Sequence, residues 1–106
     1  MSLSNQERKR LRQIGHSLNP VVMLGSQGLT DNVVEEALRA LADHELIKVK
    51  VAGEDKEQRL MLLQALAERT DAQIVQQVGK MALFYKKAAK QNQHLSNLVR
   101  FASQGK

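Results

Sequence analysis

The sequence predicts an α/β fold, of the α+β two-layer kind, with the element order α-β-α-β-α-β-β and a four-stranded mixed sheet. Two observations support this prediction, and a third limits the chemistry of the chain. Hydrophobic residues make up 42% of the 106 residues, which is enough for one core in one domain. Helical and strand-like spacings of apolar residues alternate along the chain, separated by helix caps, one proline and glycine turns. No cysteine is present, which excludes disulfides, thiolate zinc sites and cysteine nucleophiles.

The first helix is predicted to follow Ser4, which can form a capping box with Glu7. Its buried stripe has helical spacing and comprises Leu11, Ile14 and Leu18. Its outer side is basic and comprises Arg8, Lys9, Arg12 and His16. We expect the helix to end at Asn19, because a residue before proline is disfavoured at helical angles.

Residues 20–24 form a valine-rich run without alternation, which predicts a strand covered on both faces. A Gly-x-x-Gly loop follows: Gly25, Ser26, Gln27 and Gly28. Thr30 is then a good N-cap for a second helix that ends near His44, where the imidazole would be a partner for the helix dipole.

The remaining elements follow from the same rules. Residues 45–52 alternate, with Lys48 and Lys50 on the wetter face of a strand. A third helix begins after Asp55 and runs to about residue 70, and strands follow at 72–78 and 81–87. Gly79 and Lys80 predict a two-residue hairpin, so the last strand runs antiparallel to the third. We expect a domain over residues 1–87 and a basic extension over 88–106 with a short helix.

Charge is unevenly distributed along the chain, which carries a formal net charge of +5. Residues 1–30 hold four basic side chains and one acidic side chain, residues 31–78 hold six and ten, and residues 79–106 hold six and none. Two basic ends around an acidic middle favour a polyanion-binding surface on one side. Two solvated basic termini would give the same composition.

The glycine loop could bind phosphate, because glycines let a backbone approach and the N-terminus of a helix presents free N–H groups. A plain strand-to-helix turn needs glycines as well. A nucleotide-binding P-loop would end in Gly-Lys-Ser/Thr, whereas Gly28 is followed by Leu29 and Thr30. Asp31 opposes phosphate binding, since its carboxylate lies at the helix start.

Three segments carry a resemblance to a known family. The stretch from His16 to Thr30, the stretch from His44 to Lys50 and the Val78-Gly79-Lys80 turn are similar, in order and spacing, to the CRM domain, named for chloroplast RNA splicing and ribosome maturation. The resemblance extends to the short bacterial stand-alone proteins of the YhbY type. Two departures are Gly15, where alanine is usual, and Lys86-Lys87-Ala88, where arginine and proline are common. The glycine predicts a looser end of the first helix.

The resemblance implies an RNA-binding domain similar to the C-terminal domain of the third translation initiation factor, with a KH-like Gly-x-x-Gly loop. It also implies that the partner is rRNA in precursors of the large ribosomal subunit. We expect a cytoplasmic monomer that is not an enzyme, with no cofactor, metal, membrane or small-molecule substrate. The predicted RNA-binding residues are Gly25, Ser26, Gln27, Gly28, Arg8, Lys9, Arg12, His16, Lys86 and Lys87. The alternative is a protein-interaction module or assembly adaptor whose basic surface binds polyanions non-specifically.

Overall fold

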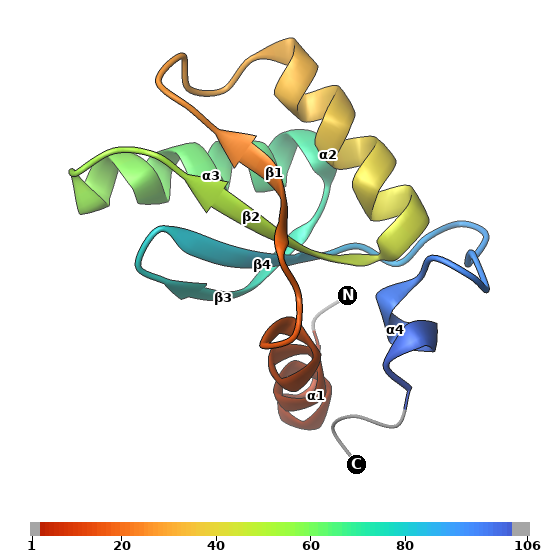
Figure 1. Cartoon of the computed structure of the whole chain (residues 1–106). Helices are drawn as coiled ribbons and strands as arrows, with labels where there is room; N and C mark the ends of the chain where they lie inside the picture. The colour runs from red at the N-terminus through yellow and green to blue at the C-terminus, as the bar shows by residue number, and fades with distance from the viewer. Residues whose placement is uncertain (1–2, 103–106) are drawn as a thin grey trace.

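The computed structural model describes residues 3–102 of the chain. Four helices and four strands follow one another as Figure 1 shows. They are α1 (Asn5–Gly15), β1 (Pro20–Leu24), α2 (Asp31–His44), β2 (Leu46–Val51), α3 (Lys56–Thr70), β3 (Gln73–Val78), β4 (Met81–Tyr85) and α4 (Asn97–Arg100). This confirms the predicted order of elements. In the described part of the chain, no helix is long and apolar enough to cross a membrane.

The four strands form one mixed sheet in the order β1-β2-β4-β3. β1 and β2 are parallel, and β4 pairs antiparallel with both β2 and β3. The connection through α3 therefore places β3 one strand position away from β2. The β3–β4 hairpin then inserts β4 between them. Gly79 has a φ of 58°, as the predicted hairpin turn requires.

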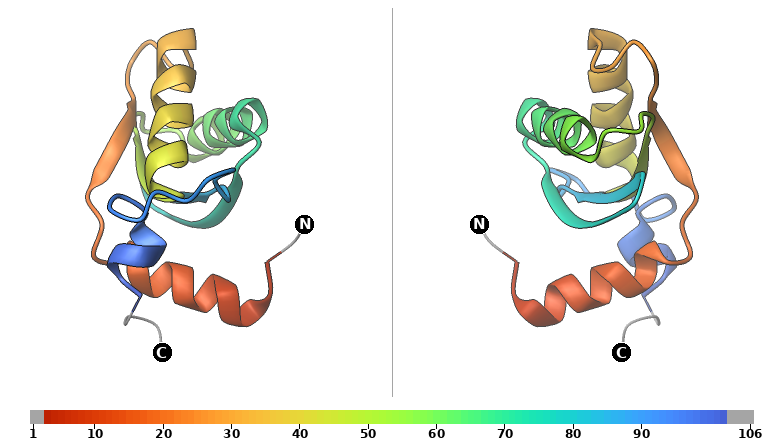
Figure 2. Two further views of the ribbon diagram at one scale, coloured as in Figure 1. Left: turned by 90° about the vertical axis from the view of Figure 1, so that its right-hand side faces the viewer. Right: turned by 90° about the vertical axis from the view of Figure 1, so that its left-hand side faces the viewer.

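Helices α2 and α3 cover one face of the sheet, as the two views in Figure 2 show. The main core lies between these two helices and the sheet. It includes Leu41, Val49, Leu63 and Phe84, each at most 1% exposed. A second, smaller cluster lies on the other face, where Leu11 and Ile14 of α1 pack against strand residues such as Leu83. Figures 1 and 2 place α1 and α4 at the end of the sheet remote from the 25–28 loop. The rest of that face is open.

The prediction that both faces of β1 are covered was wrong. Val22 and Leu24 are buried against the helical layer, but Val21 and Met23 are 54% and 55% exposed. β1 is an edge strand, and α1 leaves its outer face uncovered. An apolar run without alternation cannot distinguish this arrangement from a fully buried strand.

The end of α1 also differs from the prediction. The regular helix ends at Gly15, four residues before Asn19, and a tighter turn continues with a bond from Leu18 N–H to the Gly15 carbonyl. Gly15 does not loosen this end: it is buried, and a Cβ built on it would overlap the side chain of Leu83. The glycine thus lets the helix end lie directly on the sheet.

A buried carboxylate ties residues 86–97 to the joint between α2 and β2. Glu45 is 2% exposed and has a φ of 63°, an unusual value for a residue with a side chain. Its Oε1 accepts hydrogen bonds from Gln91 Nε2 (2.6 Å) and Ser96 Oγ (2.8 Å), and its Oε2 accepts from Ala88 N–H (2.9 Å). The backbone carbonyl of Glu45 accepts from Lys86 N–H.

Two neighbouring contacts strengthen this attachment. His44 Nδ1 donates to the Leu95 carbonyl (2.9 Å), since a carbonyl can only accept. Asn97 Nδ2 donates to the Leu46 carbonyl (2.6 Å). His44 is therefore a structural donor at the end of α2, and the short helix α4 is docked on the sheet. The division of the chain at residue 87 stays a prediction.

Candidate nucleic-acid interface

The 25–28 loop is a tight turn between β1 and α2. Gly28 N–H donates to the Gly25 carbonyl (2.9 Å), and Gly28 has a φ of 72°, which favours glycine. A Cβ on Gly25 would meet no atom within 4 Å, so the outer side of the loop is open. Ser26 and Gln27 are exposed at its tip. A phosphate could therefore approach this backbone closely.

Two contacts at the start of α2 affect this approach in opposite directions. Thr30 Oγ1 accepts from Val33 N–H (3.2 Å), so one free N–H of the helix already has a partner. The Asp31 carboxylate is paired with Arg69 Nη2 of α3 (2.9 Å), which balances its charge. Both side chains are largely exposed, so the pair adds little stability. The ion pair with Arg69 does, however, weaken the repulsion between the Asp31 carboxylate and an anion bound at the loop.

A shallow hollow of about 590 Å³ adjoins the loop. Besides the loop itself, Gly53, Gln58 and Leu62 line it, from the β2–α3 connection and α3. Its polar side chains are the Ser26 hydroxyl and the amides of Gln27 and Gln58, and its lining contains no acidic residue. The hollow offers hydrogen bonds to a ligand that passes over the loop.

The uncovered part of the sheet is a second candidate surface, which we call the open sheet face: Val21, Met23, Lys48, Lys50, Gln76, Val78 and Met81. Lys48 and Lys50 lie on it because their neighbours Ile47, Val49 and Val51 point into the main core. Lys50 lies between Met23 of β1 and Met81 of β4 in the sheet register. None of the four described strands contains an acidic residue.

Acidic residues gather in the opposite layer. Of the eleven Asp and Glu residues, ten fall between residues 31 and 71, in α2, α3 and the segments next to them, and the other is Glu7. Since α2 and α3 cover the far face of the sheet, the open sheet face carries Lys48 and Lys50 and includes no acidic residue. Within the described residues, the two ion pairs, Asp31–Arg69 and Glu54–Lys80, do not involve Lys48 or Lys50.

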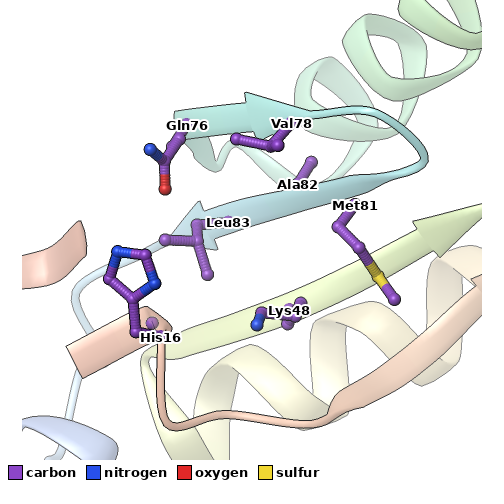
Figure 3. A pocket seen from close by; sticks show the side chains of 8 residues that line it. His16, Lys48, Gln76, Val78, Met81, Ala82 and Leu83 are labelled. Atoms are coloured by element: carbon purple, nitrogen blue, oxygen red, sulfur yellow. The ribbon is translucent and has the colours of Figure 1, made fainter. Parts of the chain in front are cut away.

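A hollow of about 210 Å³ lies on the open sheet face below the end of α1. Figure 3 shows His16, Lys48, Gln76 and Met81 around it, with Leu83 at its floor. Gly15 lines the side nearest the helix. This hollow combines an apolar floor with polar side chains from three separate elements.

The structure separates the predicted RNA-binding residues into three places. Gly25, Ser26, Gln27 and Gly28 lie at one end of the sheet, where β1 and β2 both finish. Arg8, Lys9 and Arg12 of α1 lie at the other end, as do Lys86 and Lys87, because β4 runs antiparallel to β2. His16 lies between, at the edge of the smaller hollow. The loop and the two lysines after β4 are therefore not neighbours.

Lys48 and Lys50 bridge this gap, and sequence reasoning did not include them among the RNA-binding residues. The alternation of residues 45–52 placed both on the wetter face of a predicted strand, which was the available signal. What the sequence did not reveal is that α1 leaves this part of the face open.

Comparison with known proteins identifies the family. Residues 3–86 match the CRS1 / YhbY (CRM) domain. The chain belongs to the CRM domain family. The match spans all four strands and α1 to α3, and the short helix α4 lies beyond it.

Relatives of this CRM domain occur in several bacteria. The chain is 46% identical over 102 residues to a probable RNA-binding protein of Pseudomonas aeruginosa, covering 96% of this chain and 98% of that one. It is 45% identical to an RNA-binding protein of Haemophilus influenzae, covering 80% and 86% of the two chains. The solution structure of a hypothetical protein from Staphylococcus aureus has a TM-score of 0.74 at 27% identity, with 90% of this chain and 98% of that chain covered.

Proposed function

We propose that this CRM domain binds RNA along a path from the 25–28 loop, over Lys50 and Lys48, to His16 and Arg12. The observation that carries the proposal is the pair of lysines on a sheet face whose strands hold no acidic residue. Phosphates of the RNA would contact the lysines and the loop, and each such contact releases counterions and strengthens binding. The names of the bacterial relatives support RNA as the polyanion.

The proposed RNA is rRNA in precursors of the large ribosomal subunit, bound in the cytoplasm to assist assembly without catalysis. Crosslinking in cells followed by sequencing of the bound RNA tests this choice, together with a gradient that separates immature from mature subunits. We expect crosslinks at defined rRNA positions and cosedimentation with immature large subunits. A uniform footprint over all cellular RNA would contradict it and favour non-specific polyanion binding. Association that survives nuclease treatment would favour a protein partner.

Gly28→Asp should weaken binding of rRNA fragments about tenfold, whereas Gly28→Asn should leave it within about twofold. Both side chains tolerate a positive φ better than other residues, and the variants differ mainly in charge. The carboxylate would repel a phosphate held by the loop and by the start of α2. Fluorescence anisotropy at matched salt measures the effect. Equal affinity of the two variants would remove the loop from the binding surface.

A further inference from the structure

An irregularity in β3 places an amide on the open sheet face. The pairing of β3 with β4 shifts between Ile74 and Gln76, so that Gln76 lies opposite Leu83 and Val78 lies opposite Met81. Without this shift, simple alternation from Ile74 would turn Gln76 toward the helical layer. β-Bulges often redirect a side chain in this way next to a binding site. Here the redirected side chain is Gln76, at the rim of the 210 Å³ hollow.

The walls of this hollow suit a flat, partly apolar group with a polar edge. Met81 and Leu83 supply an apolar floor, and the His16 ring and the Gln76 amide lie together at the end of the hollow away from Met81 (Figure 3). Gly15 keeps the space between helix and sheet narrow, because the helix end lies directly on Leu83. Imidazole rings stack on unpaired bases, and thioether sulfur contacts aromatic rings favourably.

Size and charge restrict the occupant further. A volume of about 210 Å³ is below the roughly 300–1,000 Å³ typical of sites for drug-sized ligands, so the hollow suits one base better than a whole dinucleotide. Lys48 is the charged residue of the lining and carries no acidic partner among the described ion pairs. A cation beside an apolar floor matches a phosphate attached to a base.

We propose that this hollow receives one unpaired nucleotide of the bound RNA, an inference that rests on the proposed function. The base lies on Met81 and Leu83 beside the His16 ring, the Gln76 amide bonds its edge, and Lys48 contacts the adjoining phosphate. Every base presents a donor beside an acceptor on its Watson–Crick edge, and an amide presents the complementary pair. Gln76 therefore anchors a base without selecting one, and the site favours single-stranded segments.

The test compares two RNA hexamers of mixed sequence, one intact and one with abasic positions, which carry the same phosphates. We expect the full-length protein to bind the intact hexamer about tenfold more tightly. Gln76→Ala should remove most of that difference, because a well-placed amide pair contributes about this factor. Gln77→Ala is the matched control, since Gln77 lies opposite Ala82 of the main core and its side chain belongs to the other face. It should bind both hexamers as the wild type does.

A second measurement locates the base. Methyl signals of methionine report on separate places, since Met81 lines the hollow and Met61 is 70% exposed on α3 in the opposite layer. The intact hexamer should shift the Met81 signal, assigned with Met81→Leu, and leave the Met61 signal unchanged. An unmoved Met81 signal, or equal binding of the two hexamers by wild type, would overturn the nucleotide site. If the nucleotide site is overturned but RNA binding still depends on Lys50, the proposed function stands. If the protein binds neither hexamer and no rRNA hairpin, the nucleotide site and the proposed function are both refuted.

Discussion

Replacing Lys48 and Lys50 together by glutamate is expected to weaken RNA binding about 100-fold at physiological salt. The change turns two positive charges into two negative ones on a face that has no other charged strand residue. A plot of log association constant against log salt concentration has a negative slope. If each lysine neutralises one phosphate, the variant should make this slope shallower by about 1.4 for a single strand and about 1.8 for a duplex. Anisotropy titrations at several salt concentrations measure both quantities.

A matched pair of single variants separates position from net charge. Lys50→Glu and Arg39→Glu alter the charge of the protein equally, but Arg39 is exposed on α2, in the layer that covers the other face. We expect about a tenfold loss of affinity for Lys50→Glu and less than a twofold loss for Arg39→Glu. Equal losses would show that RNA responds to the overall charge and not to the open sheet face. Both positions are solvent-accessible, so thermal unfolding should change little.

Glu45→Ala should lower the free energy of unfolding by about 3 kcal/mol, the largest stability effect that we expect of a single substitution in this chain. Alanine would leave the Ala88 N–H and the buried Ser96 hydroxyl without their acceptor, so residues 88–97 would be held to the α2–β2 joint by the remaining bonds of Leu95 and Asn97. For a domain of this size, the melting temperature should fall by more than about 10 °C. Circular dichroism during heating measures the change.

Glu45→Gln is the control that separates charge from shape. Its carbonyl can still accept, but its amide nitrogen is a donor and cannot replace both carboxylate oxygens. We expect a loss between that of Glu45→Ala and the wild type. A melting temperature of Glu45→Ala close to that of the wild type would contradict the structural role of this carboxylate.

The same carboxylate should make stability depend on pH. Burial alone would raise the pKa of Glu45, but bonds from Ala88, Gln91 and Ser96 and the charge of Lys87 lower the pKa below its usual 4.5. The folded state then binds fewer protons than the unfolded chain, so this contribution is present above about pH 4.5 and is lost as the pH falls through the folded-state pKa. The difference in melting temperature between wild type and Glu45→Gln should therefore shrink on acidification below pH 4.5. A constant difference down to pH 3 would contradict this linkage.

Features set by neighbouring residues could be predicted from the sequence. The capping box of Ser4 and Glu7, the Thr30 cap and the Gly79 hairpin turn all depend on groups within three residues, and the structure contains each of them. The alternating face of Lys48 and Lys50 has the same local origin. Such features follow from backbone hydrogen bonding and from the two-residue period of a strand.

Features set by distant residues could not be predicted. The Glu45 contacts join residues 43 to 51 positions apart, and the position of β4 in the middle of the sheet depends on which strands remain unpaired. The same limit applies to the predicted interface: Lys86 and Lys87 follow β4, and only the antiparallel direction of β4 beside β2 places them away from Gly28. The shift at Gln76 also depends on pairing with another strand.

The central place of β4 has a consequence for synthesis of the protein. Of the four strands in residues 3–102, β4 is made last, yet it pairs with both β2 and β3. A nascent chain that ends before residue 81 therefore has two strands with unpaired backbone edges, and the sheet can close only after the hairpin has emerged. Residues 88–97, which satisfy the Glu45 carboxylate, emerge later still. Folding of this domain must consequently wait for β4 and residues 88–97, instead of advancing from the N-terminus as translation proceeds.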